Sequence, residues 1–68
     1  MYVHVDPNLL RPTIKPEKAQ QRMFQLIQIR NEQAERAADR WTMDQLNLYV
    51  EVAIRRVKRL ERMKHRLL

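Results

Sequence analysis

The sequence contains no cysteine, no glycine and no serine. Without cysteine the chain has no disulfide framework and no thiolate that binds a metal ion or attacks a substrate. Small secreted proteins usually depend on disulfides, so we expect a reducing compartment, either the cytoplasm or a virion. Without serine the chain also lacks the commonest hydroxyl nucleophile.

Long hydrophobic runs are absent as well. No apolar run approaches the roughly 18–20 residues that cross a bilayer. The first residues, Met1 to Asp6, lack the basic and apolar regions of a signal peptide. We therefore expect a protein that is neither secreted nor membrane-spanning and that starts at its own initiator methionine. The 68 residues set one small domain as the upper limit.

Proline occurs only at the beginning of the chain, where all 3 prolines lie within the first 16 residues. The remainder has neither proline nor glycine and is dominated by residues that favour helix, such as Gln, Glu, Arg, Ala and Leu. Pro16 is the expected helix start, because proline suits the first helical turn. The pattern predicts an all-α protein with an extended N-terminal arm over residues 1–15 and an α-helical hairpin over residues 16–68.

The predicted helical region has one break, close to its middle. Thr42 and Gln45 fit a capping box. Trp41 and Leu46 fit a hydrophobic staple around the same N-cap. One unbroken helix is the alternative, because no glycine precedes the break to end a first helix. The favoured prediction is an antiparallel pair of helices, over about residues 16–39 and 43–66.

Apolar residues recur at alternating steps of three and four along both predicted helices, which is the spacing of a coiled-coil or bundle seam. A chain this short buries only about 60% of its unfolded surface, and two helices have no enclosed centre. We therefore expect the hairpin to complete its core against its own arm or by oligomerisation or partner binding. The expected protein-interface residues are apolar side chains of the arm and of the outer helix faces: Tyr2, Val3, Val5, Leu9, Leu10, Phe24, Leu48 and Val52.

Arg30 interrupts the apolar seam of the first predicted helix. In one interpretation its aliphatic stem covers the seam while its guanidinium reaches water. In the other it is a core polar residue, paired with Glu51 or with a partner chain. Such a buried pair often sets the register of packing rather than adding stability.

The net charge of +6 is concentrated near the C-terminus. Residues 1–54 carry equal numbers of basic and acidic side chains, whereas residues 55–66 carry 7 basic side chains and one acidic side chain. Cations at a helix C-terminus complement the helix dipole, which is the simplest interpretation. Arginine also binds carboxylates and phosphates bidentately. The alternative is therefore a face that binds an anionic partner, formed by Arg55, Arg56, Lys58, Arg59, Arg62 and Arg66.

No constellation of catalytic side chains is visible. The 2 histidines, His4 and His65, are not spaced for a shared metal site, and we expect no metal, no cofactor and no small-molecule substrate. A remote enzymatic alternative uses Arg30, Glu51 and Arg11 to bind an anionic transition state electrostatically. The outer face of the second predicted helix lacks the large aromatics of interfacial helices, so we expect no membrane partner.

The sequence favours a small non-enzymatic protein-interaction module, acting as an adaptor, an inhibitor or an assembly subunit. Small helical hairpins of this composition occur among viral and bacterial accessory proteins, an analogy of type without shared motif residues. Residues Tyr2 to Val5 alternate in polarity like a short strand that adds to a partner's sheet, and Asp6-Pro7-Asn8 is typical of a turn. The alternative function is nucleic-acid binding through the arginine-rich face, although no aromatics are interleaved for base stacking.

Overall fold

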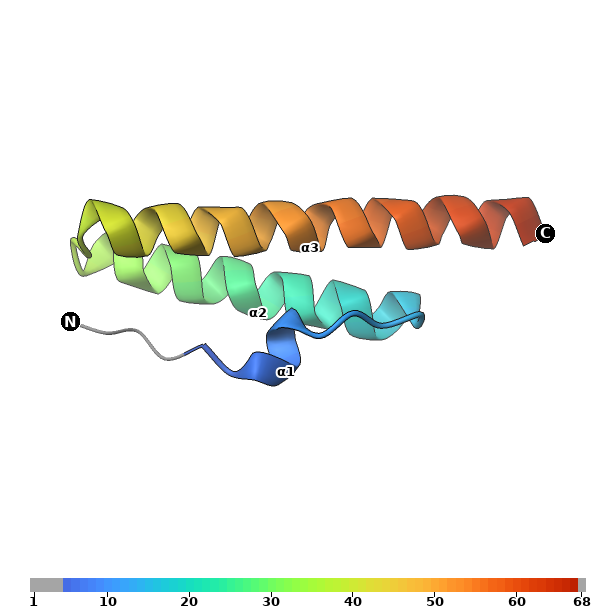
Figure 1. The fold of residues 1–68 in the computed structure, drawn as a ribbon, viewed down its shortest axis with the longest axis horizontal. Helices are drawn as coiled ribbons and strands as arrows, with labels where there is room; N and C mark the ends of the chain where they lie inside the picture. Colours follow the sequence, from blue (N-terminus) through green and yellow to red (C-terminus); the bar gives the residue numbers. More distant parts are fainter. Residues whose placement is uncertain (1–4, 68) are drawn as a thin grey trace.

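The computed structural model describes the backbone of residues 5–67 and the side chains of residues 5–63. Within this range the chain forms three helices, α1 (Pro7–Leu10), α2 (Pro16–Glu35) and α3 (Arg40–Leu67), and no strand. The all-α class is therefore confirmed. Helices α2 and α3 lie side by side and run in opposite directions, with the arm and α1 beside them (Figure 1). No helix in the described part is long and apolar enough to cross a membrane.

The arm is not extended throughout, because it contains α1. The Asp6 carboxylate accepts a hydrogen bond from the backbone N–H of Asn8 at 2.9 Å, and Pro7 occupies the first helical position. An aspartate N-cap followed by proline favours helix initiation, since both fit the unpaired N–H groups of a first turn. The segment predicted as a turn is therefore the start of a short helix.

Helix α2 begins at Pro16 as predicted but ends at residue 35 instead of residue 39. Ala37 follows with a left-handed φ of 55°. The Ala37 N–H donates to the Ala34 carbonyl at 3.1 Å, and the Ala38 N–H donates to the Gln33 carbonyl at 3.0 Å. These two bonds form a Schellman motif, which usually has glycine at the left-handed position. The helical region breaks here even though the chain has no glycine.

Helix α3 begins at Arg40, three residues before the expected residue 43, because Asp39 is its cap. The Asp39 carboxylate accepts a hydrogen bond from the backbone N–H of Thr42 at 3.2 Å. Hydrogen bonds from the Thr42 side chain and backbone hold the pKa of Asp39 below its ordinary value. Thr42 is therefore an internal, buried residue of the first turn, and the predicted capping box and Trp41–Leu46 staple are wrong.

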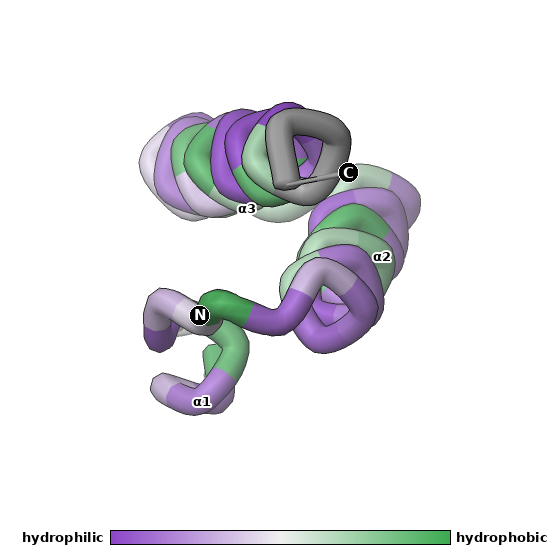
Figure 2. Tube along the Cα trace, turned by 90° about the vertical axis from the view of Figure 1, so that its right-hand side faces the viewer, coloured by the Kyte–Doolittle hydropathy of each residue, from purple (hydrophilic) through white to green (hydrophobic). Residues whose placement is uncertain are grey.

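The core lies between α2 and α3 and is centred on Leu26, Val50 and Ala53, all buried. Partly buried side chains from all three segments pack against this cluster. Figure 2, which looks along the helices, shows the arm beside α2 and α3 as a third segment. The arm thus covers part of the seam that two helices alone leave open. The surrounding side chains are Val5, Leu9, Leu10, Met23, Ile27, Tyr49 and Ile54.

Candidate functional site

Two arginines attach the arm to the helices. Arg22 of α2 donates from Nη1 to the Arg11 carbonyl at 2.7 Å, and Arg56 of α3 donates from Nη1 to the Leu10 carbonyl at 3.0 Å. Both carbonyls lie at the C-terminal end of α1, where the helix supplies no partner for them. Hydrogen bonds from a charged donor are stronger than neutral ones. We call this pair the arginine clamp.

The clamp changes the interpretation of Arg56, which sequence reasoning grouped with the anion-binding face. Arg56 is half-buried, and its guanidinium contacts the arm of the same chain. Its position on the helix is the signal that distinguishes it from its neighbours. Arg56 follows the buried Ala53 by three residues, whereas Arg55 and Arg59 lie on the exposed flank of α3.

An open groove of about 630 Å³ lies next to the arginine clamp, and Arg56 is among the residues that line it. Segment 12–17, which leads into α2, forms one wall, and the described end of α3 forms the other. Ile14 on the first wall is 89% exposed, and Met63 on the second wall is 50% exposed. Leu60, also on the second wall, is half-buried and so less exposed than either. We call this site the arm groove.

The arm groove exists because the two long helices end at different levels. Pro16, the first residue of α2, and Leu60 of α3 line the same groove. Helix α3 continues to Leu67 and projects beyond the start of α2 (Figure 1). Pro12 and Pro16 line the groove and restrict the backbone of the segment before α2.

Positive charge lies at the rim of the arm groove. Arg59 is exposed and lines the groove. The ion pairs within residues 5–63 are Arg40–Asp44 and Arg55–Glu51, so Arg59 is unpaired among the described side chains.

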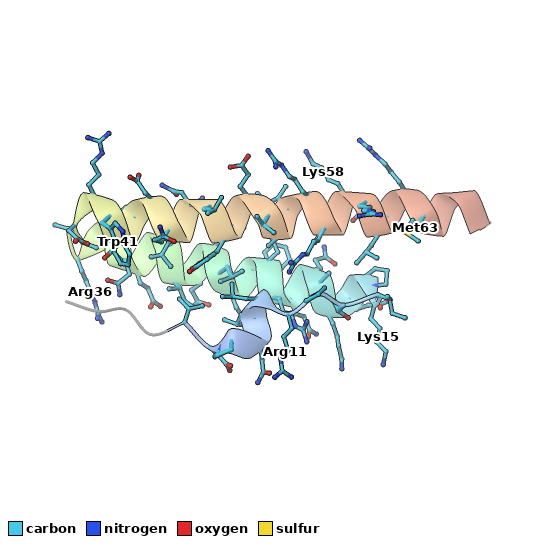
Figure 3. All side chains as sticks on the ribbon, viewed as in Figure 1. Arg11, Lys15, Arg36, Trp41, Lys58 and Met63 are labelled. Atoms are coloured by element: carbon cyan, nitrogen blue, oxygen red, sulfur yellow. The ribbon has the colours of Figure 1, made fainter. Side chains whose placement is uncertain are left out.

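The other members of the predicted anion-binding face differ in their surroundings. The Arg55 guanidinium donates to Glu51 at 2.5 Å, which offsets its charge. Arg62 is exposed, and Lys58 points outward on the side of α3 away from α2 (Figure 3). The side chain of Arg66 lies outside the described residues. Of the five predicted residues whose side chains are described, Arg59 alone both lines the groove and is exposed.

The predicted apolar interface residues fall into two groups. Val5, Leu9 and Leu10 pack against the core of their own chain, and Tyr2 and Val3 lie outside the described residues. The helix residues are more open: Phe24 is 57% exposed and Leu48 is 50% exposed, while Val52 is half-buried.

Sequence reasoning missed Trp41 as an exposed side chain by assigning it to a staple. Trp41 is 65% exposed. It borders a smaller hollow of about 200 Å³, whose other walls include Val5 of the arm and Tyr49 of α3.

Arg30 does not form the predicted pair with Glu51. Arg30 is half-buried, and its guanidinium donates to the Oδ1 atom of its exposed neighbour Asn31 at 3.4 Å. Glu51 accepts from Arg55 one turn away on the same helix. Within the part of the chain whose side chains are described, no group of three metal-ligating side chains comes together. His4 and His65 lie outside that part.

Comparisons with known proteins give no relative of this chain. No protein-family model, no curated protein and no solved structure matches it.

Proposed function

We propose that this chain is a small non-enzymatic protein-interaction module that binds an acidic partner through the arm groove and the adjoining flank of α3. The observation that carries the proposal is the juxtaposition of exposed apolar side chains, Ile14 and Met63, with the guanidinium of Arg59, which has no ion-pair partner among the described residues. Recognition sites in proteins combine apolar area, which supplies binding free energy, with a few polar groups that fix orientation.

Protein rather than nucleic acid is the favoured partner because the arm groove has apolar lining side chains that are not aromatic. Phosphate contacts supply most of the affinity in nucleic-acid binding, and apolar side chains contribute mainly where they stack on bases. The described residues that line the arm groove include no aromatic side chain. An acidic protein segment uses both features, since its carboxylates pair with arginine and its apolar side chains bury Ile14 and Met63.

A selection from a random peptide display library on the immobilised full chain tests this proposal. We expect enriched peptides that combine acidic and apolar residues. A triple variant, Lys58→Ala, Arg59→Ala and Arg62→Ala, should lose these peptides. A matched variant, which removes the same number of charges at the exposed Lys18, Arg36 and Arg40, should retain them.

Two outcomes contradict the proposal. The first is the absence of any enriched peptide. The second is tighter binding of a single-stranded oligonucleotide than of every selected peptide at about 0.15 M salt, with a steep salt slope that the triple variant flattens. The second outcome would mean that Lys58, Arg59 and Arg62 bind nucleic acid.

A further inference from the structure

We propose that the arm groove is a docking site for an acidic amphipathic helix of another protein, which lies along the end of α3 in line with α2. The inference rests on the proposed function and names the partner of the same site. It is carried by the gradient of exposure along α3, by the exposed wall at Ile14 and by the charge of the rim.

Exposure rises along the inner side of α3 at the level where α2 ends. Val57 is 7% exposed, Leu60 is half-buried and Met63 is 50% exposed. Ala53, which is 7% exposed, and Leu60 are seven residues apart and share one face of α3, and Met63 neighbours Leu60 three residues further on. This part of the α3 surface is thus buried at Ala53 and increasingly exposed from Leu60 to Met63. A second helix in line with α2 restores that cover by the packing of side-chain ridges into grooves that joins α2 to α3.

The opposite wall supplies an anchor that residues 5–63 leave uncovered. Among these described side chains, Ile14 is the most exposed large hydrophobic one, at 89%. It lies between Pro12 and Pro16, and the Lys15 N–H donates to the Thr13 hydroxyl at 3.2 Å, so the segment has a defined local conformation. The clamp at Leu10 and Arg11 fixes the start of this segment to both long helices. A rigid wall that presents an isoleucine suits an apolar side chain on the facing helix.

The rim charge selects an acidic helix and disfavours a second copy of this chain. Arg59 lines the groove, and Arg62 is exposed on the next turn. Glu17 is the one acidic side chain among the described lining residues. A carboxylate beside the apolar stripe of such a helix therefore meets Arg59 at the α3 rim. Residues 55–66 carry 7 basic side chains and one acidic side chain, so two copies docked through these ends repel each other.

Fluorescence anisotropy with a designed peptide tests the proposal on the full chain. The peptide has about 18 residues, five helical turns, with leucine along one face and glutamate on both flanks. We expect saturable binding that weakens as salt rises, because exposed charges are screened. A peptide of the same composition in scrambled order, which has no apolar face, should bind at least about tenfold more weakly, and so should a version with lysine in place of glutamate.

Variants of the chain locate the peptide. Ile14→Ser combined with Met63→Ser should weaken binding of the designed peptide at least about tenfold, and Arg59→Glu should do the same. Phe24→Ser and Arg36→Glu are the matched controls, because they make the same chemical changes at exposed positions outside the arm groove, and they should leave affinity within about twofold. Circular dichroism melts establish that each variant is folded, which is expected because every substituted side chain is exposed.

Three results overturn the proposal, and they separate it from the proposed function. If the Ile14→Ser and Met63→Ser double variant leaves peptide affinity unchanged while Arg59→Glu abolishes binding, the module binds an acidic partner but not through the groove. If neither the designed peptide nor any selected peptide binds, both proposals fail. The third result is tighter binding of anionic phospholipid vesicles or of a single-stranded oligonucleotide than of the peptide. If the Ile14→Ser and Met63→Ser double variant loses that binding, the groove has a different occupant.

Discussion

Ala37→Gly is expected to stabilise the protein, which is unusual for an alanine-to-glycine change. Ala37 has a φ of 55°, where the Cβ atom of an L-residue is close to the following carbonyl. That contact costs about 1–2 kcal/mol, and glycine removes it. Glycine also gives the unfolded chain more freedom, which opposes the gain by about 0.4–1 kcal/mol. The net expectation is about 0.5–1 kcal/mol of added stability.

The assay is thermal unfolding followed by circular dichroism at one fixed protein concentration. In a domain of this size 1 kcal/mol corresponds to about 4–8 °C, so the melting temperature should rise by about 2–8 °C. Ala38→Gly is the matched control, because the neighbouring residue does not have a positive φ and should lose about 0.4–1 kcal/mol. Equal destabilisation by both changes would refute the reasoning, since that is the result for one unbroken helix.

The remaining predictions concern the clamp, the cap and the core. Arg56→Ala should cost about 1.5–3 kcal/mol and expose the amide hydrogens of the arm to exchange with solvent, whereas Arg59→Ala should leave exchange unchanged. The pKa of Asp39 is lowered in the folded state, so its contribution to stability is present above the ordinary carboxyl pKa and is lost as pH falls through the folded value. The difference in melting temperature between the wild type and Asp39→Ala should therefore shrink in acid. Leu26→Ala, at a buried site, should cost about 2–5 kcal/mol in urea unfolding, against about 0.5 kcal/mol or less for Phe24→Ala.

The sequence carried enough local information to find the helices but not to place their ends. Proline and helix propensity located the start of α2 at Pro16, because both act within a single turn. The break was found but shifted, since Asp39 and Thr42 are both good N-cap residues. Tertiary packing decides between them: Thr42 is 6% exposed in the first turn of α3, where its N–H and hydroxyl bond to Asp39. No local pattern shows that preference.

The candidate site was less predictable, because its parts are distant in the sequence. The clamp joins Arg56 to Leu10, which are 46 residues apart, and the groove joins Ile14 to Met63. A stripe of arginines is visible in the sequence, but the arm contact that removes Arg56 from it depends on the whole fold. The pairing of Arg55 with Glu51 spans one helical turn and was available from spacing alone.

The direction in which each arginine of α3 points determines how it is used. Arg56 lies toward the arm, where an unpaired helix carbonyl needs a donor and the surroundings are half-buried. Arg59 lies at the groove rim with no described partner, and a charge in such a place retains its full capacity to bind a carboxylate. Substituting lysine at both positions separates these roles. Lysine reaches one carbonyl as a point charge but lacks the planar fork for a bidentate carboxylate contact. Arg56→Lys should therefore retain more of its function than Arg59→Lys.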